Sequence, residues 1–452
     1  MPDDWVVIKL SDVADVRHGF AFEGEFFRNE PPGDILLTPG NFRIGGGFKN
    51  DSLKYYVGPV PDEFVLEEGD LLVTMTDLSK NGDTLGYPAI VPCTYNARFL
   101  HNQRLGKVNI KQAAPLDKCF LYYLLCTPGY RNEILASATG TTVKHTSPQR
   151  ILSFSFRMPP ISEQRAIGQT LGALDDKIEL NRRMNETLEA MARAIFKSWF
   201  VDFEPVRAKI DGRWRRGQSL PGLPANLYDL FPDSFEHSPL GEIPKGWRTT
   251  RLGDAFEINP PRSLPPGAMS PYLDMANMPW NSPRPLGWVD RAFTSGMKFI
   301  NGDTLLARIT PCLENGKTAF VDFLADGQVG WGSTECIALR SKAPFPVEYS
   351  YFLARSDDFR AHAIANMTGT SGRQRVPVSC LDGYIVVVSS PPVAERFREF
   401  VQPTMAAIKQ RDEESRALAA IRDALLPKLI SGELRVKDSG KPFTEKRLRH
   451  PV

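Results

Sequence analysis

One long stretch without proline decides the architecture of this chain. Residues 163–200 read EQRAIGQTLGALDDKIELNRRMNETLEAMARAIFKSWF and contain only two glycines. Alternate steps of four and three residues along this stretch reach mainly apolar side chains, which is the spacing of a helix that buries one narrow seam. The seam consists of Ile167, Leu171, Leu174, Ile178, Asn181, Asn185, Leu188, Ala192, Ile195 and Trp199. An isolated helix cannot bury its own seam, so the pattern predicts a helical partner.

A second seam with the same phase occurs near the end of the chain. It consists of Phe397, Val401, Thr404, Ile408, Arg411, Ser415, Leu418, Arg422, Leu425 and Leu429, each 230 residues beyond its counterpart (397 − 167 = 230). The polar interruptions also coincide, with Asn181 and Asn185 matching Arg411 and Ser415. If the two helices pair antiparallel, these polar centres meet, and other registers bury polar groups against leucine. The alternative is that each helix packs only on the segment that precedes it.

The rest of the chain also contains an internal sequence repeat. Trp5, Leu10 and Asp12 recur as Trp247, Leu252 and Asp254. ILLTPGNFR (35–43) resembles PYLDMANMP (271–279), EEGDLLV (67–73) resembles INGDTLL (300–306), and KNGDT (80–84) resembles ENGKT (314–318). FLYYLL (120–125) resembles EYSYFLA (348–354), and Thr139-Gly140-Thr141 matches Thr368-Gly369-Thr370. We therefore expect two copies of one module.

Each copy reads as mixed α and β structure. Short apolar runs at 71–75 and 384–388 predict strands, and apolar residues at helical spacing predict helices over 117–138 and 348–365. The expected fold class is α+β, with two similar modules joined by two long antiparallel coiled-coil helices in a pseudo-two-fold repeat. The expected segments are a first module at 1–158, a central helix at 159–205, a linker at 206–240, a second module at 241–391, a C-terminal helix at 392–432 and a basic flexible tail at 433–452.

Composition excludes several classes of protein. No run approaches the ~18 apolar residues of a membrane span, and the start lacks a signal-peptide pattern, so we expect a cytoplasmic protein. Six cysteines lie apart without a CxxC pair, and six histidines show no ligand spacing, so no metal site is expected. The net charge of +2 does not by itself indicate a nucleic-acid partner. The basic runs at 207–216 and 435–449 are interpreted as solvated segments, with contact to phosphate as the alternative.

Several stretches resemble one known family. FPDSFEHSPLGEIPKGWRTTRLGD (231–254) resembles the segment that opens the second half of type I restriction–modification specificity subunits. Residues 159–205 look like the central helical region of that family, IRDALLPKLISGEL (421–434) is similar to its C-terminal helix, and GFAFEGEFF (19–27) fits its opening loop. With the duplication, the resemblance covers essentially the whole chain.

The resemblance implies a DNA-recognition subunit without a catalytic site of its own. It implies that two target-recognition domains each read half of a split sequence in double-stranded DNA, and that the two helices act as a spacer. It further implies docking of two modification subunits, which bind S-adenosylmethionine and methylate adenine, and motor-nuclease subunits in the full restriction complex. This chain would bind no cofactor itself.

Two alternatives from other classes remain open: a self-sufficient DNA methyltransferase or nuclease, and a coiled-coil adaptor without a DNA role. Asn259-Pro260-Pro261 resembles the turn that holds a target amine in amino-methyltransferases, but Arg262 stands where an aromatic should follow. Gly316-Lys317-Thr318 resembles the end of a phosphate-binding loop, but Pro311 replaces its first glycine. These broken motifs argue against catalysis by this chain.

Candidate DNA contacts follow the two Thr-Gly-Thr segments, where donors suited to base edges gather. They are Lys144, His145, Gln149 and Arg150 in the first copy, and Arg373, Gln374 and Arg375 in the second. Asn41, Arg43 and Asn277 lie on the other repeated loop and are weaker candidates. For each residue, a role as an exposed polar side chain that contacts only water is the alternative.

Overall fold

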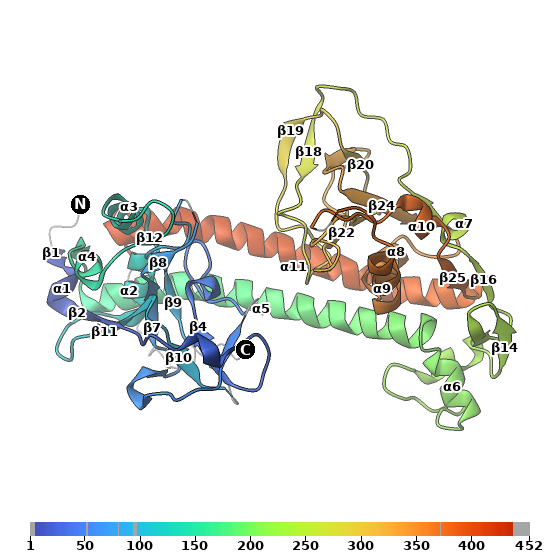
Figure 1. The fold of residues 1–452 in the computed structure, drawn as a ribbon, viewed down its shortest axis with the longest axis horizontal. Coiled ribbons are helices and arrows are strands. Elements are labelled where there is room, and N and C mark those ends of the chain that lie inside the picture. Colours follow the sequence, from blue (N-terminus) through green and yellow to red (C-terminus); the bar gives the residue numbers. More distant parts are fainter. Residues whose placement is uncertain (1–4, 51–52, 80, 94–96, 371, 437–452) are drawn as a thin grey trace. The chain divides into compact units, whose positions relative to one another are not determined.

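The chain forms two compact units. The computed structural model describes residues 5–50, 53–79, 81–93, 97–370 and 372–436. One unit combines Met1–Ile178 with Arg416–Val452, and the other is Glu179–Ser415. Figure 1 shows their elements. Both long helices contribute a segment to each unit.

The first unit contains a mixed α/β module with two main sheets. One is antiparallel with the order β2-β11-β7-β9, and the other has the order β3-β5-β4-β10-β6, in which β4 and β10 are parallel. The first and last strands of the module along the chain, β1 and β13, pair with each other. The bounds are β1 Val6–Lys9, β2 Ala14–His18, β3 Phe27–Arg28, β4 Asp34–Leu37, β5 Lys54–Tyr56, β6 Val65–Leu66, β7 Leu71–Thr74, β9 Pro88–Ile90, β10 Phe99–His101, β11 Leu105–Ile110 and β13 Ser155–Met158.

The second unit repeats this topology. Its sheets have the orders β17-β24-β21-β22 and β19-β18-β23-β20, β18 and β23 are parallel, and β16 pairs with β25. Apart from β3, which lacks a counterpart among the described strands, the strands of the two main sheets correspond in order and direction, and the first and last strands pair in both modules. This arrangement agrees with the repeat predicted from the sequence. The bounds are β16 Arg248–Arg251, β17 Phe256–Ile258, β18 Met269–Leu273, β19 Val289–Ala292, β20 Met297–Phe299, β21 Thr304–Ala307, β22 Thr318–Phe320, β23 Gly330–Gly332, β24 Cys336–Ser341 and β25 Ile385–Val388.

Each module packs a pair of short helices against its central sheet. The single helix expected at 117–138 is two, because Thr127 caps a new helix and Pro128 occupies its first position. The stretch 348–365 also divides into two helices, at Ser356, which is the N-cap residue of the second. The pairs are α2 Lys118–Leu125 with α3 Pro128–Ala136, and α8 Tyr349–Arg355 with α9 Asp357–Ala365; the shorter helices are α1 Leu10–Val13, α4 Pro148–Leu152, α7 Leu252–Ala255 and α10 Val378–Asp382.

The two long helices are α5, Ile161–Phe200, and α11, Pro391–Ser431. Helix α5 begins earlier than the N-cap predicted at Ser162. The amides of Glu163 and Gln164 already donate to the Pro160 carbonyl, so the first turn is closed from Pro160. Since proline has no amide hydrogen to lose, a helix start directly after Pro160 leaves fewer donors unpaired.

The first residues of each seam fill the core of the adjoining module. Ile167 and Leu171 are fully buried in the core that contains Phe120 and Leu124. Their counterparts Phe397 and Val401 are buried in the core of the second unit. The packing that the sequence left as an alternative therefore holds for these positions.

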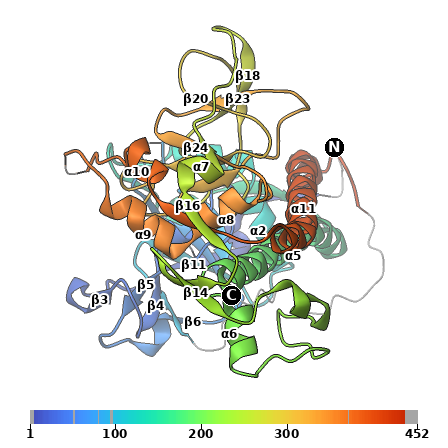
Figure 2. The same ribbon diagram turned by 90° about the vertical axis from the view of Figure 1, so that its right-hand side faces the viewer.

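The long helices also pack on each other within both units. In the first unit Leu426 and Leu429 of α11 share one core with Ile167. In the second unit Phe196 of α5 lies 6.0 Å from Phe397 of α11, measured between ring centroids. There the two helices lie side by side (Figures 1 and 2).

Polar groups of the two long helices meet within the second unit, as the seam pattern predicts. The Asn181 amide nitrogen lies 3.4 Å from the Arg411 carbonyl and 3.3 Å from the Ser415 hydroxyl. The Asn185 amide donates to the Ile408 carbonyl at 3.2 Å. Because the partner number falls as the α5 number rises, the helices run antiparallel within this unit.

The segment predicted as a linker at 206–240 is folded, although the side chains of Arg207, Arg213, Arg215 and Arg216 are exposed, as a solvated run would have them. It contains α6 Glu204–Ile210, η4 Ala225–Leu230 and most of the hairpin β14 Phe235–Ser238 with β15 Gly241–Pro244. Trp214 is 1% exposed and packs near Phe231, which in turn packs on Trp199 of α5. The basic residues are paired locally, as Arg213 is with Glu204 at 2.6 Å. Aromatic residues spaced along the segment build this core, a pattern that charge counting alone does not detect.

Two further observations bear on the class of protein. None of the helices in the described part of the chain is long and apolar enough to cross a membrane. Among the same residues, no group of three or more potential ligands gathers to hold a metal ion. Most of the tail predicted at 433–452 lies outside the described residues.

Candidate nucleic-acid interface

Both Thr-Gly-Thr segments form a small hairpin of the same geometry. Thr139 and His145 exchange two backbone hydrogen bonds, of 3.0 and 2.8 Å. Thr368 and Arg375 do the same at 2.9 and 2.8 Å. The sequence similarity therefore reports a repeated structure, in which the backbone of a residue six or seven positions after the Thr closes the hairpin. In Figure 2 the second hairpin belongs to the chain between α9 and α10.

Glycine is required at the turn of both hairpins. Gly140 has a φ of +91°, and a Cβ there would lie 1.9 Å from the Val143 carbonyl oxygen. Gly369 has a φ of +123°, and its Cβ would lie 3.1 Å from the Arg373 carbonyl oxygen. Side chains are disfavoured at such positive φ values. The hairpins therefore depend on these glycines for their shape.

The returning arm of each hairpin is fixed to the end of a central strand. In the first module β12, Lys144–His145, pairs with β8, Thr76–Asp77. In the second, Arg375 forms an isolated bridge with Ile309, just beyond β21. A rigid sheet thus carries an exposed loop, the arrangement in which recognition residues are commonly found.

Each module also has an Asn-Gly loop that is held by arginines from its helix pair. In the first module the Arg131 guanidinium of α3 donates to the Gly82 carbonyl. In the second, Arg360 of α9 donates to the Glu314 carbonyl at 2.9 Å, and Arg355 of α8 donates to the Gly316 carbonyl at 3.0 Å. The two Asn-Gly loops are therefore held by equivalent arginine contacts.

The structure brings all four candidates of the first module together at its hairpin. Lys144 is half-buried and faces Asp77 across the strand pair. His145 is exposed, and its Nδ1 lies 3.2 Å from the Thr76 hydroxyl. Gln149 and Arg150 lie on α4 directly after the hairpin, and an Arg150 Nη1 donates to the Thr139 hydroxyl at 3.5 Å.

Asp77 is a residue of this site that the sequence reasoning missed. It is 5% exposed and accepts hydrogen bonds from the Ser79 amide and the Thr84 hydroxyl, each at 2.6 Å, and from the Thr84 amide. Burial favours the neutral acid, but these donors outweigh it and lower the pKa of Asp77. Asp77 thus holds Ser79 and Thr84 in place and faces Lys144 across the strand pair. An acid followed by Ser and Thr at these spacings is the signal that could have found it.

The three candidates of the second module lie together but in different environments. Arg373 is exposed at the turn of the hairpin. Gln374 is tied by its backbone to Thr310, with an amide-to-hydroxyl distance of 3.1 Å. Arg375 forms hydrogen bonds of 2.6 to 3.0 Å with Glu335, and these bonds lower the pKa of the Glu335 carboxyl. Glu335 was not predicted from the sequence, because it lies 40 residues from Arg375 along the chain.

The three weaker candidates, on the other repeated loop, differ in how exposed their side chains are. Asn41 is 1% exposed, and its amide oxygen accepts from the Thr38 amide at 2.9 Å, so its side chain is used inside the module. Asn277 is half-buried and donates to Asp274 at 2.9 Å. Arg43 is exposed. Only Arg43 among these three has the exposure that a DNA contact requires.

Both catalytic look-alikes have structural roles here. The Asn259 side chain accepts from the Ala338 amide at 2.9 Å and closes the end of β17. The Lys317 ammonium donates to the Met275 carbonyl at 2.6 Å, and Thr318 is buried in β22. These structural contacts explain why Asn259, Lys317 and Thr318 are present, and no catalytic role is needed to explain them.

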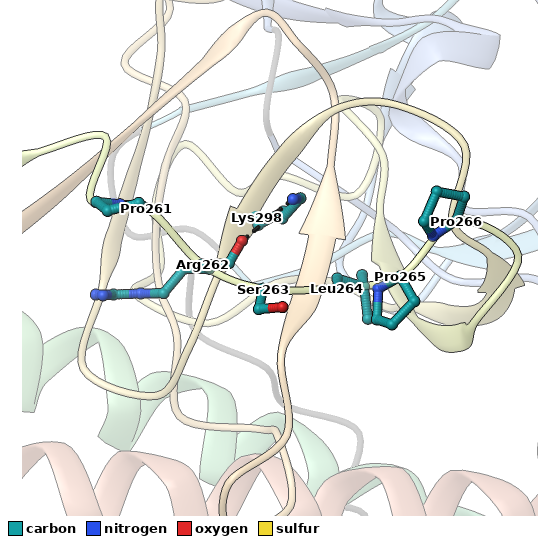
Figure 3. A pocket seen from close by; sticks show the side chains of 7 residues that line it. All are labelled: Pro261, Arg262, Ser263, Leu264, Pro265, Pro266 and Lys298. Carbon is teal, nitrogen blue, oxygen red and sulfur yellow. Dashed lines mark hydrogen bonds between the residues drawn. The ribbon is translucent and has the colours of Figure 1, made fainter.

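A shallow hollow in the second module does not form a site either (Figure 3). It is lined by Pro261, Arg262, Ser263, Leu264, Pro265, Pro266 and Lys298. The Lys298 ammonium donates to the Arg262 carbonyl at 3.1 Å, and the Arg262 guanidinium reaches Asp303 at 3.2 Å. The two cations are used separately and do not converge on a ligand.

Comparisons with known proteins agree with the duplicated architecture. Residues 2–190 match the family described as type I restriction modification DNA specificity domain. The chain is 26% identical to the type I restriction enzyme MjaIX specificity subunit of Methanocaldococcus jannaschii, over 97% of this chain and 95% of that protein. It is 46% identical to the HindI specificity subunit of Haemophilus influenzae over 20% of each chain.

A solved structure has the same fold. The S subunit of a type I restriction–modification system from M. genitalium aligns with a TM-score of 0.55 and 16% identity, over 95% of this chain and 97% of that one. A duplicated α/β module with long helices defines the class of this fold. The chain is similar to type I restriction–modification specificity subunits over nearly its whole length.

Proposed function

We propose that this chain reads a bipartite target in double-stranded DNA through the hairpins of its two modules. The observation that carries the proposal is the repeated hairpin: the same scaffold presents His145 in one copy and Arg375 in the other. Equal scaffolds with different side chains suit two half-sites of different sequence, since base identity is read by donors and acceptors on the side chains.

The helices α5 and α11 supply the spacer in this proposal. Two modules related by a pseudo-two-fold repeat, on antiparallel helices, would touch two short sequences separated by bases that are not read. The meeting of Asn181 with Ser415 supports a fixed register for the helix pair, because a polar seam position disfavours other registers.

The partners follow from the family. The chain would dock two modification subunits, which bind S-adenosylmethionine and methylate adenine, and motor-nuclease subunits would complete the restriction complex. The relatives are named as specificity subunits of restriction enzymes, so we assign recognition, and not catalysis, to this chain. The two look-alike motifs, whose residues have structural roles, give no support to a self-sufficient methyltransferase.

Co-expression with a modification subunit from the same organism tests the proposal. Methylated adenines should map to a split motif only when both chains are present. Methylation by this chain alone would favour a self-sufficient methyltransferase, and an unchanged methylation pattern in its presence would favour an adaptor without a DNA role.

A further inference from the structure

The contact between Glu335 and Arg375 joins the second hairpin to the residue that directly precedes β24. Arg375 Nε lies 2.8 Å from Glu335 Oε2, and Nη2 lies 2.6 Å from Oε1. Nη1 of the same guanidinium lies 3.3 Å from the Arg373 carbonyl. Glu335 is itself fixed, because its amide donates to the Ser333 hydroxyl at 3.1 Å and its carbonyl accepts from the Arg308 amide at 2.9 Å.

Stability does not explain this contact well. The side chains of Arg375 and Glu335 are 44% and 25% exposed. Ion pairs with such exposure contribute little to folding, because water screens them and two long side chains lose freedom. A contact of little value to folding at an exposed recognition loop points to a role in binding.

Three of the five N–H hydrogens of the guanidinium are used inside the module, because Nε and Nη2 donate to Glu335 and Nη1 donates to the Arg373 carbonyl. One hydrogen on each Nη atom remains for a ligand. Two donors on neighbouring Nη atoms have the spacing that matches O6 and N7 of guanine in the major groove. Holding the planar group in advance removes the entropy loss of fixing a long side chain upon binding.

The first module offers an internal comparison. Its hairpin closes with His145, which faces the Thr76 hydroxyl at 3.2 Å and not a carboxylate. The Glu335 carboxylate is therefore found with Arg375 in the second module and is not a feature that both hairpins share. This pairing is expected if Glu335 serves the side chain at position 375.

We propose that Glu335 is a positioning residue that orients Arg375 to read a guanine in the second half-site. The proposal rests on the DNA-reading function proposed above. It also implies lower non-specific affinity, because the Glu335 carboxylate partly offsets the attraction of Arg375 to phosphate. Discrimination between sequences, more than total affinity, is the property that Glu335 should control.

The test uses the chain assembled with its modification subunits. Binding is measured at one fixed salt concentration to duplexes that carry the methylated motif and to unrelated duplexes of equal length. Methylation is then measured on duplexes with each base pair of the second half-site replaced in turn. The variants are Glu335→Gln, Arg375→Ala and, as a matched control, Glu314→Gln, which removes an exposed carboxylate from the neighbouring loop without touching Arg375.

Glu335→Gln should lower the ratio of specific to non-specific affinity by about tenfold, with non-specific binding unchanged or stronger. It should relax discrimination at the same G·C pair as Arg375→Ala. Glu314→Gln should leave the ratio within about twofold, and the melting temperature of Glu335→Gln should stay within a few degrees of the wild type.

Three results would overturn the proposal. One is an unchanged specificity ratio in Glu335→Gln. Another is an equal rise in affinity for cognate and unrelated DNA, which would mean that Glu335 only repels DNA in general. The third is a uniform loss across all sequences in Arg375→Ala, which would assign Arg375 to a phosphate. If the wild-type complex methylates no split motif, the proposed function fails instead, so the two failures are distinguishable.

Discussion

The amide of Asn181 donates a 2.8 Å hydrogen bond to the carboxylate of Glu414, and so joins the two long helices within the second unit. Asn181 is 0% exposed in the middle of a seam that is otherwise largely apolar. A buried amide at a seam position costs some stability but selects the register in which it finds partners. The polar interruption visible in the sequence therefore has a defined contact in the fold.

Replacement of Asn181 by Asp should strongly destabilise the second unit. The substitution places a carboxylate beside Glu414 in a fully buried position, so the free energy of unfolding at neutral pH should fall by about 3 kcal/mol or more. Chemical denaturation measures this change. Thr187→Asp, which adds the same charge at an exposed position of α5, is the control and should change stability by less than about 0.5 kcal/mol. Equal effects of the two substitutions would contradict the buried contact.

Replacement of Arg373 and Arg375 by Ala should weaken binding to the cognate DNA by about 1–3 kcal/mol. Both side chains are exposed on the second hairpin, where guanidinium groups can reach DNA. A binding assay at controlled salt measures the loss. Arg215→Ala removes an equally exposed charge from the folded linker and should leave the affinity unchanged. Retained cognate affinity in the double variant would reject the hairpin as a contact.

Replacement of Gly140 by Ala should damage recognition more than folding. The new Cβ would overlap the Val143 carbonyl at a φ of +91°, so the hairpin must change shape at a local cost of about 1–3 kcal/mol. Methylation at the cognate motif should fall by at least about tenfold. Gly129→Ala is the control, because Gly129 lies in the first turn of α3 with open space around it. Wild-type methylation by Gly140→Ala would show that this turn does not act in recognition.

The pH dependence of stability should carry the signature of Asp322. Burial raises the pKa of this carboxyl to about 6, although Arg284 and Lys409 oppose the rise; Asp412 and Glu413 add to it. The folded state therefore holds a proton that the unfolded chain, with a pKa of 3.8, has released. The resulting stabilisation is fully present below pH 3.8 and is lost as the pH rises through about 6.

Comparison of the wild type with Asp322→Asn isolates this proton, because the amide does not titrate. The stability of the wild type relative to the variant should fall between pH 4 and pH 6, the window set by the two pKa values. Asp326→Asn, at an exposed position of the loop that follows, is the matched control. A difference that stays constant over this range, or that grows with pH, would show that Asp322 keeps its ordinary pKa.

The sequence alone predicted much of the fold, because periodic patterns report local geometry. The seams from Ile167 and Phe397 identified both long helices, and the repeated short motifs identified two modules that share strand order and direction. The Thr-Gly-Thr segments were located because glycine at a positive φ leaves a direct mark on the sequence. Predictions that depended on single boundaries were less accurate, as at Ser162 and over 117–138, where prolines start or divide helices.

Only the tertiary structure decided which side chains act together. It buried Asn41, folded the basic run around Trp214, and placed Glu335 on Arg375 and Asp77 beside Lys144. These relationships join residues far apart along the chain, and no local pattern encodes them. Periodicity specifies elements because hydrophobic burial acts along one helix or strand, whereas the contacts of a binding site depend on the packing of several elements at once.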